Sequence, residues 1–247
     1  MELSVVVPVR NEAENLKPLL GEIVQALQGL CDYEIVYVDD GSTDDTLARL
    51  AVLRADFPRL RVLRHRQSRG QSTALLTGIR AAAGEVVATL DGDGQNDPAD
   101  IPRLLQALRE LRQENPLAMV AGHRKQRKDT GWRRFTSRVA NAVRAALLGD
   151  ATPDTGCGLK VFSRELFLRL PAFDHMHRFL PALAQRADGK VVSVAVNHRP
   201  RMSGVSKYGT WQRLWAGIVD IIGVIWLQRR AVVVEIEETE FQKQSNI

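Results

Sequence analysis

The sequence is poor in cysteine, and its two cysteines, Cys31 and Cys157, do not form a C-x-x-C pair. This excludes a disulfide framework and a structural zinc site, and it is typical of a reducing compartment. No uninterrupted apolar run reaches eighteen residues, so we expect no transmembrane helix. The apolar stretch within residues 1–8 is also too short for a secretory signal peptide. We therefore expect a cytoplasmic protein.

The chain has 247 residues, of which 45% are apolar and 26% charged, as in ordinary soluble proteins that bury one sizeable core. Its net charge of +5 is unevenly placed, because seven of the residues 123–138 are Lys or Arg and one, Asp129, is acidic. This basic run is either a solvated helix face or a site for an anion such as a diphosphate or an anionic lipid. No RNA-binding motif or aromatic platform accompanies it, so we expect no nucleic-acid partner.

Strand-like and helix-like segments alternate through the first half of the chain. The expected strands are 3–7, 34–38, 60–63, 86–90 and 118–121, and the expected helices are 14–30, 43–53, 73–83 and 102–114. This order predicts an α/β fold with a mostly parallel, doubly wound sheet. Ligands bind such sheets beyond the carboxyl ends of the strands, and the polar clusters 10–12, 39–44 and 91–97 all follow strands in this way.

The second half is less regular. We expect helices over 132–148 and 179–186, a glycine-rich turn over 154–160, and strands over 161–162 and 191–197.

The most informative segment holds two carboxylates, Asp91 and Asp93, directly after an apolar strand. Successive side chains leave a strand in opposite directions, but a break at Gly92 would let both acids turn toward one point. Hard oxygen ligands of this kind suit Mg²⁺ or Mn²⁺, which would also take oxygens from phosphates. Gln95 could add a neutral oxygen. The alternative is an acidic turn that binds nothing.

Several motifs occur in an order that resembles the family-two glycosyltransferases of the GT-A fold, and among them the dolichol-phosphate mannosyltransferase or polyprenyl-phosphate glycosyltransferase group. They are VPVRNE at 7–12, VDDGS at 38–42, GQSTALLTG at 70–78, DGDGQ at 91–95, GHR at 122–124, TGCG at 155–158 and RPRMSGVSK at 199–207. The resemblance covers residues 3–210. The chain departs from it at Arg10, where many members carry an aromatic or small residue, and we expect it to lack the paired C-terminal transmembrane helices of many bacterial relatives.

The resemblance implies a nucleotide-sugar donor, with GDP-mannose and UDP-sugars as the candidates. The donor site would comprise Pro8, Arg10, Glu12, Val38, Asp40, Gly92, Arg124, Arg201 and Lys207. Asp91 and Asp93 would hold the metal on the diphosphate, with Gln95 as a further contact. Two alternatives stay open: Asp40 could merely cap the following helix, and the loop cations at 201 and 207 could have no role.

The acceptor separates the subfamilies. A sugar hydroxyl needs a general base, whereas a polyprenyl phosphate is already an anion that could attack the anomeric carbon and invert it. Asp154 is the candidate carboxylate near the acceptor, where it would act as a base, orient the acceptor or merely form a turn. His175 and His177 are expected at the surface or the acceptor site and not as metal ligands. A non-catalytic protein that binds a lipid or partner is the remaining alternative.

Residues 211–227 are largely apolar but interrupted by Asp220 and followed by Arg229 and Arg230. Tryptophans and flanking arginines suit a helix in a membrane interface, although a core or dimer helix would have a similar pattern. We expect a catalytic domain over 1–210, this amphipathic helix over 211–230 and a tail over 231–247. The enzyme would sit peripherally on the cytoplasmic face of a membrane, with a homo-oligomer or a separate membrane partner as further possibilities.

Overall fold

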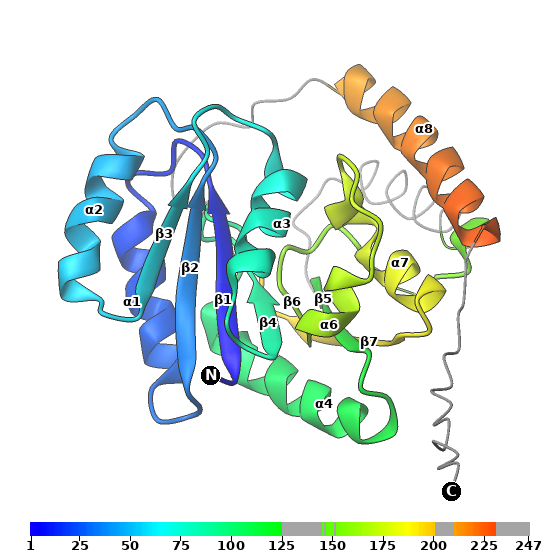
Figure 1. Cartoon of the computed structure of the whole chain (residues 1–247), viewed down its shortest axis with the longest axis horizontal. Coiled ribbons are helices and arrows are strands. Elements are labelled where there is room, and N and C mark those ends of the chain that lie inside the picture. The colour runs from blue at the N-terminus through cyan, green and yellow to red at the C-terminus, as the bar shows by residue number, and fades with distance from the viewer. Residues whose placement is uncertain (125–144, 146, 151, 201–209, 231–247) are drawn as a thin grey trace, which may run out of the picture.

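A computed structural model describes residues 1–124, 145, 147–150, 152–200 and 210–230. Within these residues one seven-stranded sheet has the order β3-β2-β1-β4-β6-β5-β7 (Figure 1). Its strands are β1 (Leu3–Val9), β2 (Tyr33–Asp39), β3 (Leu60–Arg64), β4 (Val86–Thr89), β5 (Ala118–Arg124), β6 (Lys160–Ser163) and β7 (Lys190–Val196). The helices are α1 (Leu16–Leu27), α2 (Thr46–Asp56), α3 (Gln71–Ala81), α4 (Ile101–Glu114), α6 (Arg164–Leu168), α7 (Leu180–Arg186) and α8 (Thr210–Arg229), with short 3₁₀ turns η1 (Pro98–Asp100) and η2 (Met176–Arg178).

The sheet is mostly parallel, with β6 running against both of its neighbours. β1 pairs in parallel with β2 and β4, and β5 pairs in parallel with β7. β6 is antiparallel to β4 and β5, with Lys160 opposite Thr89 on one side and Ala121 on the other. Because β6 is reversed, the loop before it arrives at the same edge as the carboxyl ends of the parallel strands.

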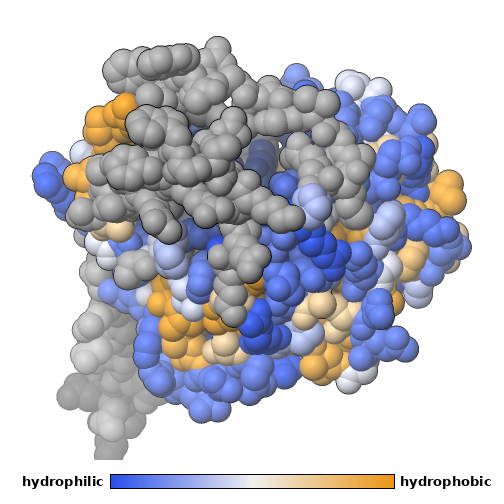
Figure 2. All heavy atoms as spheres, turned by 180° about the vertical axis from the view of Figure 1, so that it is seen from behind, coloured by the Kyte–Doolittle hydropathy of each residue, from blue (hydrophilic) through white to orange (hydrophobic). Residues whose placement is uncertain are grey.

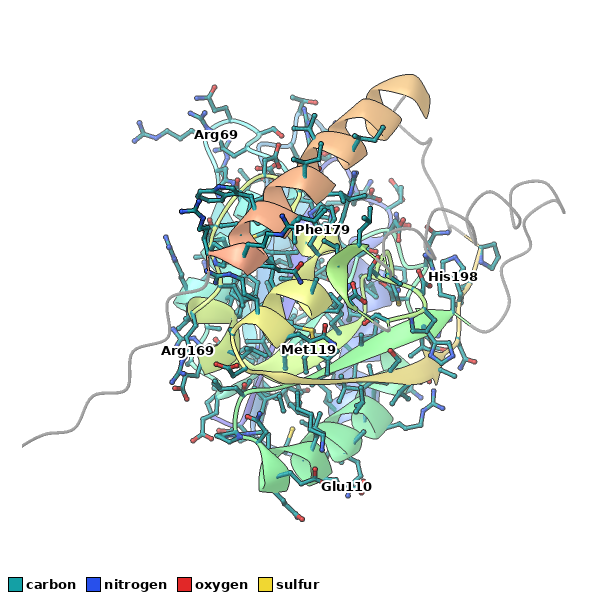
Figure 3. All side chains as sticks on the ribbon, turned by 90° about the vertical axis from the view of Figure 1, so that its right-hand side faces the viewer. Arg69, Glu110, Met119, Arg169, Phe179 and His198 are labelled. Carbon is teal, nitrogen blue, oxygen red and sulfur yellow. The ribbon has the colours of Figure 1, made fainter. Side chains whose placement is uncertain are left out.

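Each face of the sheet is covered by its own hydrophobic cluster. Leucines and isoleucines at helical spacing on α1 and α4, joined by Leu50 and Leu53 of α2, pack on one face. On the other face, α3, α6, α7 and α8 pack on strand residues such as Met119 and Phe162. Figure 3 labels Phe179, which precedes α7, and Met119 of β5. Both belong to this second cluster, which α8 joins through the fully buried Val224.

The predicted α/β architecture is confirmed, including every strand expected in the first half. Sequence periodicity did not predict the reversed direction of β6, the short α6, or the 3₁₀ turns η1 and η2. The helix predicted over 132–148 and most of the basic run lie outside the described residues. No helix among the described residues is long and apolar enough to cross a membrane.

Candidate active site

The polar clusters expected at strand ends meet at one edge of the sheet. β1, β2, β4 and β5 all point the same way, upward in Figure 1, and each ends in or is followed by polar residues. The reversed β6 adds the loop 154–159 to this edge. The edge therefore combines an acidic turn, a glycine-rich loop and the last residue of β5, Arg124.

The acidic turn is built so that Asp91 and Asp93 lie close together. The backbone N–H of Asp91 donates to Oδ1 of Asn96 at 3.1 Å, and Oδ1 of Asp93 accepts from the N–H of Gln95 at 3.1 Å. Gly92 passes so close to β1 that an added Cβ would lie 2.6 Å from Val9, so a side chain does not fit there. Burial and the neighbouring Asp93 carboxylate raise the pKa of Asp91 to about 6.

The glycine-rich loop packs directly on the Asp91 carboxylate. A Cβ on Gly158 would lie 2.2 Å from Oδ2 of Asp91, so the glycine leaves room for the carboxylate in its present position. The hydroxyl of Thr89 donates to the carbonyl of Gly158 at 2.7 Å, and the amide of Asn96 contacts Sγ of Cys157 at 3.9 Å. The loop and the acidic turn are therefore one packed unit.

A buried lysine, Lys160, lies beneath this unit. Its side chain is almost inaccessible to solvent, and its ammonium donates to the carbonyls of Thr155, at 3.2 Å, and of Cys157. Burial lowers the pKa of Lys160, while the nearby thiol of Cys157 and the carboxylate of Asp91 act in the opposite direction. Sequence reasoning missed this residue, although a lysine that opens an apolar strand directly after a glycine-rich loop is a usable signal.

Arg124 and Asp154 form a two-point ion pair beside the acidic turn. Nε of Arg124 donates to Oδ2 of Asp154 at 2.6 Å and Nη2 donates to Oδ1 at 2.7 Å. Both side chains are largely buried, with 15% and 11% of their surface exposed. The hydrogen bond to Asp154 raises the pKa of Arg124. The structure thus joins a residue predicted for the donor phosphates to the residue predicted for the acceptor.

The predicted nucleoside residues lie at the ends of β1 and β2. Pro8 and Glu12 are partly buried and Arg10 is exposed, whereas the side chain of Val38 is fully buried in the core against Gly78. Val38 can therefore offer a ligand its backbone. The oxygen Oε2 of Glu12 accepts from the Asn15 amide at 2.6 Å.

Asp40 holds the loop that leads into α3. Its two carboxylate oxygens accept hydrogen bonds from the Ser68 hydroxyl and from the backbone N–H groups of Arg69 and Gly70, at 2.7 to 2.9 Å. Nδ1 of His65 lies 2.7 Å from Oδ1. Burial alone would raise the pKa of Asp40, but these hydrogen bonds lower it. If Asp40 also bound the base of the nucleotide, it would have to use carboxylate oxygens that already accept hydrogen bonds from this loop. The loop itself lies at the top of Figure 3, where Arg69 is labelled.

Arg201 and Lys207 lie outside the described residues, but the chain that leads to them is anchored at the acidic turn. The N–H of Arg199 donates to the carbonyl of Gln95 at 3.0 Å, and its guanidinium binds Glu22 and Asp97. Figure 3 places His198, the preceding residue, at one side of the molecule.

His175 and His177, which we expect at the surface or the acceptor site, both contact other elements of the fold, and an acceptor role for either stays a prediction. His177 is largely buried and its Nδ1 lies 2.7 Å from the Ser72 hydroxyl of α3, and burial together with Arg178 lowers its pKa to about 3. His175, about one third exposed, contacts Asp220 of α8 at 3.0 Å. The pair therefore links α3 to α8.

A family assignment follows from comparison with known proteins. Residues 4–170 match the sequence profile of Glycosyl transferase family 2. The chain belongs to this family. Residues 4–170 therefore form a glycosyltransferase domain, as the ordered motifs predicted.

Two similar proteins have names that describe enzymes acting on lipid phosphates. The chain is 36% identical over 235 residues to dodecaprenyl-phosphate galacturonate synthase of Rhizobium johnstonii, covering 93% of this chain and 68% of that protein. It is 36% identical over 209 residues to undecaprenyl-phosphate 4-deoxy-4-formamido-L-arabinose transferase of Pseudomonas syringae, covering 83% of this chain and 60% of that protein. The chain thus spans roughly two thirds of the length of these relatives.

Solved glycosyltransferase structures support the fold. Glucosyl-3-phosphoglycerate synthase of Mycobacterium tuberculosis, solved with Mn²⁺, UDP-glucose and glycerol 3-phosphate, aligns with a TM-score of 0.63 at 23% identity over 98% of this chain and 85% of that one. The mannosyltransferase PcManGT of Pyrobaculum calidifontis, solved with GDP-mannose and Mn²⁺, aligns with a TM-score of 0.61 at 22% identity, over 92% and 64%. The GT-A fold predicted for this glycosyltransferase is confirmed.

The acidic turn suits a metal ion shared with a ligand. Among the described residues, no group of three or more His, Cys, Asp or Glu side chains could hold a metal ion by itself. Two adjacent carboxylates, one of them seated against the bare backbone of Gly158, instead offer a partial set of hard oxygens. Mg²⁺ and Mn²⁺ commonly complete such sets with phosphate oxygens and water.

Proposed function

We propose that this glycosyltransferase moves a monosaccharide from a nucleotide sugar to a polyprenyl phosphate and inverts the anomeric carbon. The observation that carries the proposal is the acidic turn next to the Arg124–Asp154 pair, in a chain 36% identical to two enzymes named for lipid-phosphate acceptors. Asp91 and Asp93, with Gln95, would hold Mg²⁺ or Mn²⁺ on the donor diphosphate. When bound, the ion would neutralise the nucleoside diphosphate that leaves.

Different residues at this edge of the sheet would bind different parts of the two substrates. Residues at the ends of β1 and β2, among them Pro8, Glu12 and the backbone of Val38, would receive the nucleoside. Arg124 would face the phosphates, because a guanidinium binds phosphate oxygens at two points. Arg201 and Lys207 would close the donor site from the segment after Arg199, and the basic run would ease the approach of a second anion.

The acceptor is proposed to be a phosphate because Asp154 is poorly placed to act as a base. Both of its oxygens already accept from Arg124, and a base must be within reach of the proton that it removes. A phosphate acceptor needs no base. In this proposal Asp154 orients Arg124 and, through it, the anions of the site.

A lipid acceptor calls for contact with a membrane surface, and α8 supplies a suitable face. Ile218, Val219, Ile222 and Trp226 are exposed at helical spacing, followed by the exposed Arg229 and Arg230. Figure 2 shows hydrophobic surface at its upper left, where α8 lies in this reversed view. We propose that this face enters the interface of a membrane with anionic lipids, on the cytoplasmic side.

The test is a transfer assay with purified protein, a polyprenyl phosphate in vesicles, Mn²⁺ or Mg²⁺ and a panel of radiolabelled GDP- and UDP-sugars. Label entering the organic phase with one donor, and lost in Asp93→Asn, would support the proposal and name the sugar. Transfer to a glycan hydroxyl in place of the lipid would overturn the acceptor assignment.

A further inference from the structure

We propose that the Asp91 carboxylate is positioned from two sides, by the amide of Gln71 and by the glycine-rich loop that Lys160 holds. The inference rests on the proposed function, in which Asp91 is a metal ligand. It assigns Gln71 and Lys160 as positioning residues, since each would act through Asp91 and not on the substrate.

The first contact is direct. Nε2 of Gln71 donates to Oδ1 of Asp91 at 2.8 Å. An amide donor on one oxygen fixes the rotation of a carboxylate and directs its remaining lone pairs. Carboxylates that bind metal ions are commonly held by hydrogen bonds of this kind.

The chain around Gln71 explains why its side chain points to Asp91. Gln71 is itself exposed and is the first residue of α3, so its neighbours must fix its direction. On one side, Gly70 has a φ of +86° and donates its N–H to Asp40. On the other side, Ser72 is buried and contacts His177. Gln71 thus stands between two anchored residues.

The second contact is steric and acts through the loop 155–158. The backbone of Gly158 lies against Oδ2 of Asp91 with no space for a methyl group. Three hydrogen bonds hold this backbone: the Lys160 ammonium donates to the carbonyls of Thr155 and Cys157, and the Thr89 hydroxyl donates to the carbonyl of Gly158. A buried ammonium that serves two carbonyls of one loop is a costly feature, which the neighbouring carboxylate of Asp91 offsets.

These contacts predict that metal affinity depends on residues that do not bind the metal. The measurement is the electron paramagnetic resonance signal of free Mn²⁺ during titration with protein in the presence of UDP, and again with GDP. We expect Gln71→Met and Lys160→Met each to raise the Mn²⁺ dissociation constant by about 10-fold or more, the usual effect of removing a residue that holds a ligand. Added Mn²⁺ should then restore transfer.

Matched controls separate positioning from general damage. Gln67→Met makes the same change four residues away at an exposed side chain, and Lys190→Met removes a lysine from a surface ion pair. Both should bind Mn²⁺ as the unaltered protein does. If Lys160→Met does not fold, Thr89→Val tests the same loop, because it removes the hydroxyl that holds Gly158.

The outcomes distinguish this inference from the proposed function. Loss of Mn²⁺ binding in Asp93→Asn with unchanged binding in Gln71→Met and Thr89→Val would overturn the positioning roles and leave the metal site in place. Unchanged binding in all variants, Asp93→Asn included, would remove the metal site and the positioning roles together.

Discussion

The guanidinium of Arg124 and the carboxylate of Asp154 meet through two hydrogen bonds of 2.6 and 2.7 Å at the edge of the sheet. The backbone N–H of Arg124 also lies 3.3 Å from Oδ2 of Asp154. The end of β5 is therefore fastened to the loop before β6, although the two residues are thirty positions apart. Loss of either partner would leave a largely buried charge without its counter-ion.

The Arg124–Asp154 pair predicts that a single variant loses more stability than a double variant. Asp154→Asn should lower the free energy of unfolding by about 2 to 3 kcal/mol, because the hydrogen bonds involve a charged group that remains buried. The double variant Arg124→Met with Asp154→Leu should recover part of this loss, since no buried charge is left. Urea denaturation of these two variants and the unaltered protein measures both effects. Equal stability of Asp154→Asn and the unaltered protein would show that the pair contributes nothing to folding.

Asp40 predicts a pH-dependent contribution to stability. Its folded-state pKa lies below the ordinary value of 3.8, so its contribution is complete above that value and is lost as the pH falls through the folded-state pKa. Asp40→Asn removes the charge that holds Ser68, Arg69 and Gly70 and should cost about 3 kcal/mol at pH 7. The difference from the unaltered protein should shrink below about pH 4. A cost that stays constant down to pH 3 would contradict this account.

The matched control for Asp40 is Asp32→Asn. Asp32 is 62% exposed and pairs at the surface with Arg59 and the N-terminus. Such pairs contribute about 0 to 1 kcal/mol, so this variant should denature nearly as the unaltered protein does.

Asp91 predicts that protons compete with the metal ion. Its pKa is raised to about 6, above the ordinary value of 3.8, so the folded protein takes up a proton there as the pH falls from 7 to 5. The apparent Mn²⁺ affinity should therefore decrease over this range, by roughly tenfold per unit below pH 6. Stability without metal has the opposite pH dependence, because the contribution of protonated Asp91 is complete below the ordinary pKa of 3.8 and is lost as the pH rises through 6. Isothermal titration calorimetry with Mn²⁺ and UDP at several pH values measures the first effect, and an affinity that is constant from pH 7 to 5 would contradict it.

The sequence predicted the parts of the site that follow strands directly. Asp91, Asp93 and Arg124 come at or just after strand ends, and parallel strands bring their ends to one edge, so local pattern and fold class suffice to bring them together. Their metal and phosphate roles remain predictions.

Contacts that depend on distant chain segments could not be predicted in the same way. Gln71 hydrogen-bonds to Asp91 across twenty residues of sequence. Lys160 lies beneath the site because β6 runs antiparallel, which the short segment 160–163 does not reveal by itself. The sequence around His177 predicts a loop, and it contains no feature that predicts the contact with Ser72. In each case the deciding partner lies on another element.

Asp220 gives the last prediction. It interrupts the apolar sequence of α8, yet it points inward to Nδ1 of His175 at 3.0 Å while Ile222 and Trp226 face outward. The acid therefore orients the helix and leaves the exposed apolar face intact. A double-mutant cycle of His175→Ala and Asp220→Ala should give a coupling energy of about 0.5 to 1 kcal/mol, as expected for a partly exposed pair. Hydrogen exchange of the α8 amides should accelerate in either single variant and not in Arg229→Ala, whose side chain is exposed at the end of the helix. A coupling energy of zero with unchanged exchange would mean that Val224 and its apolar neighbours hold α8 without this contact.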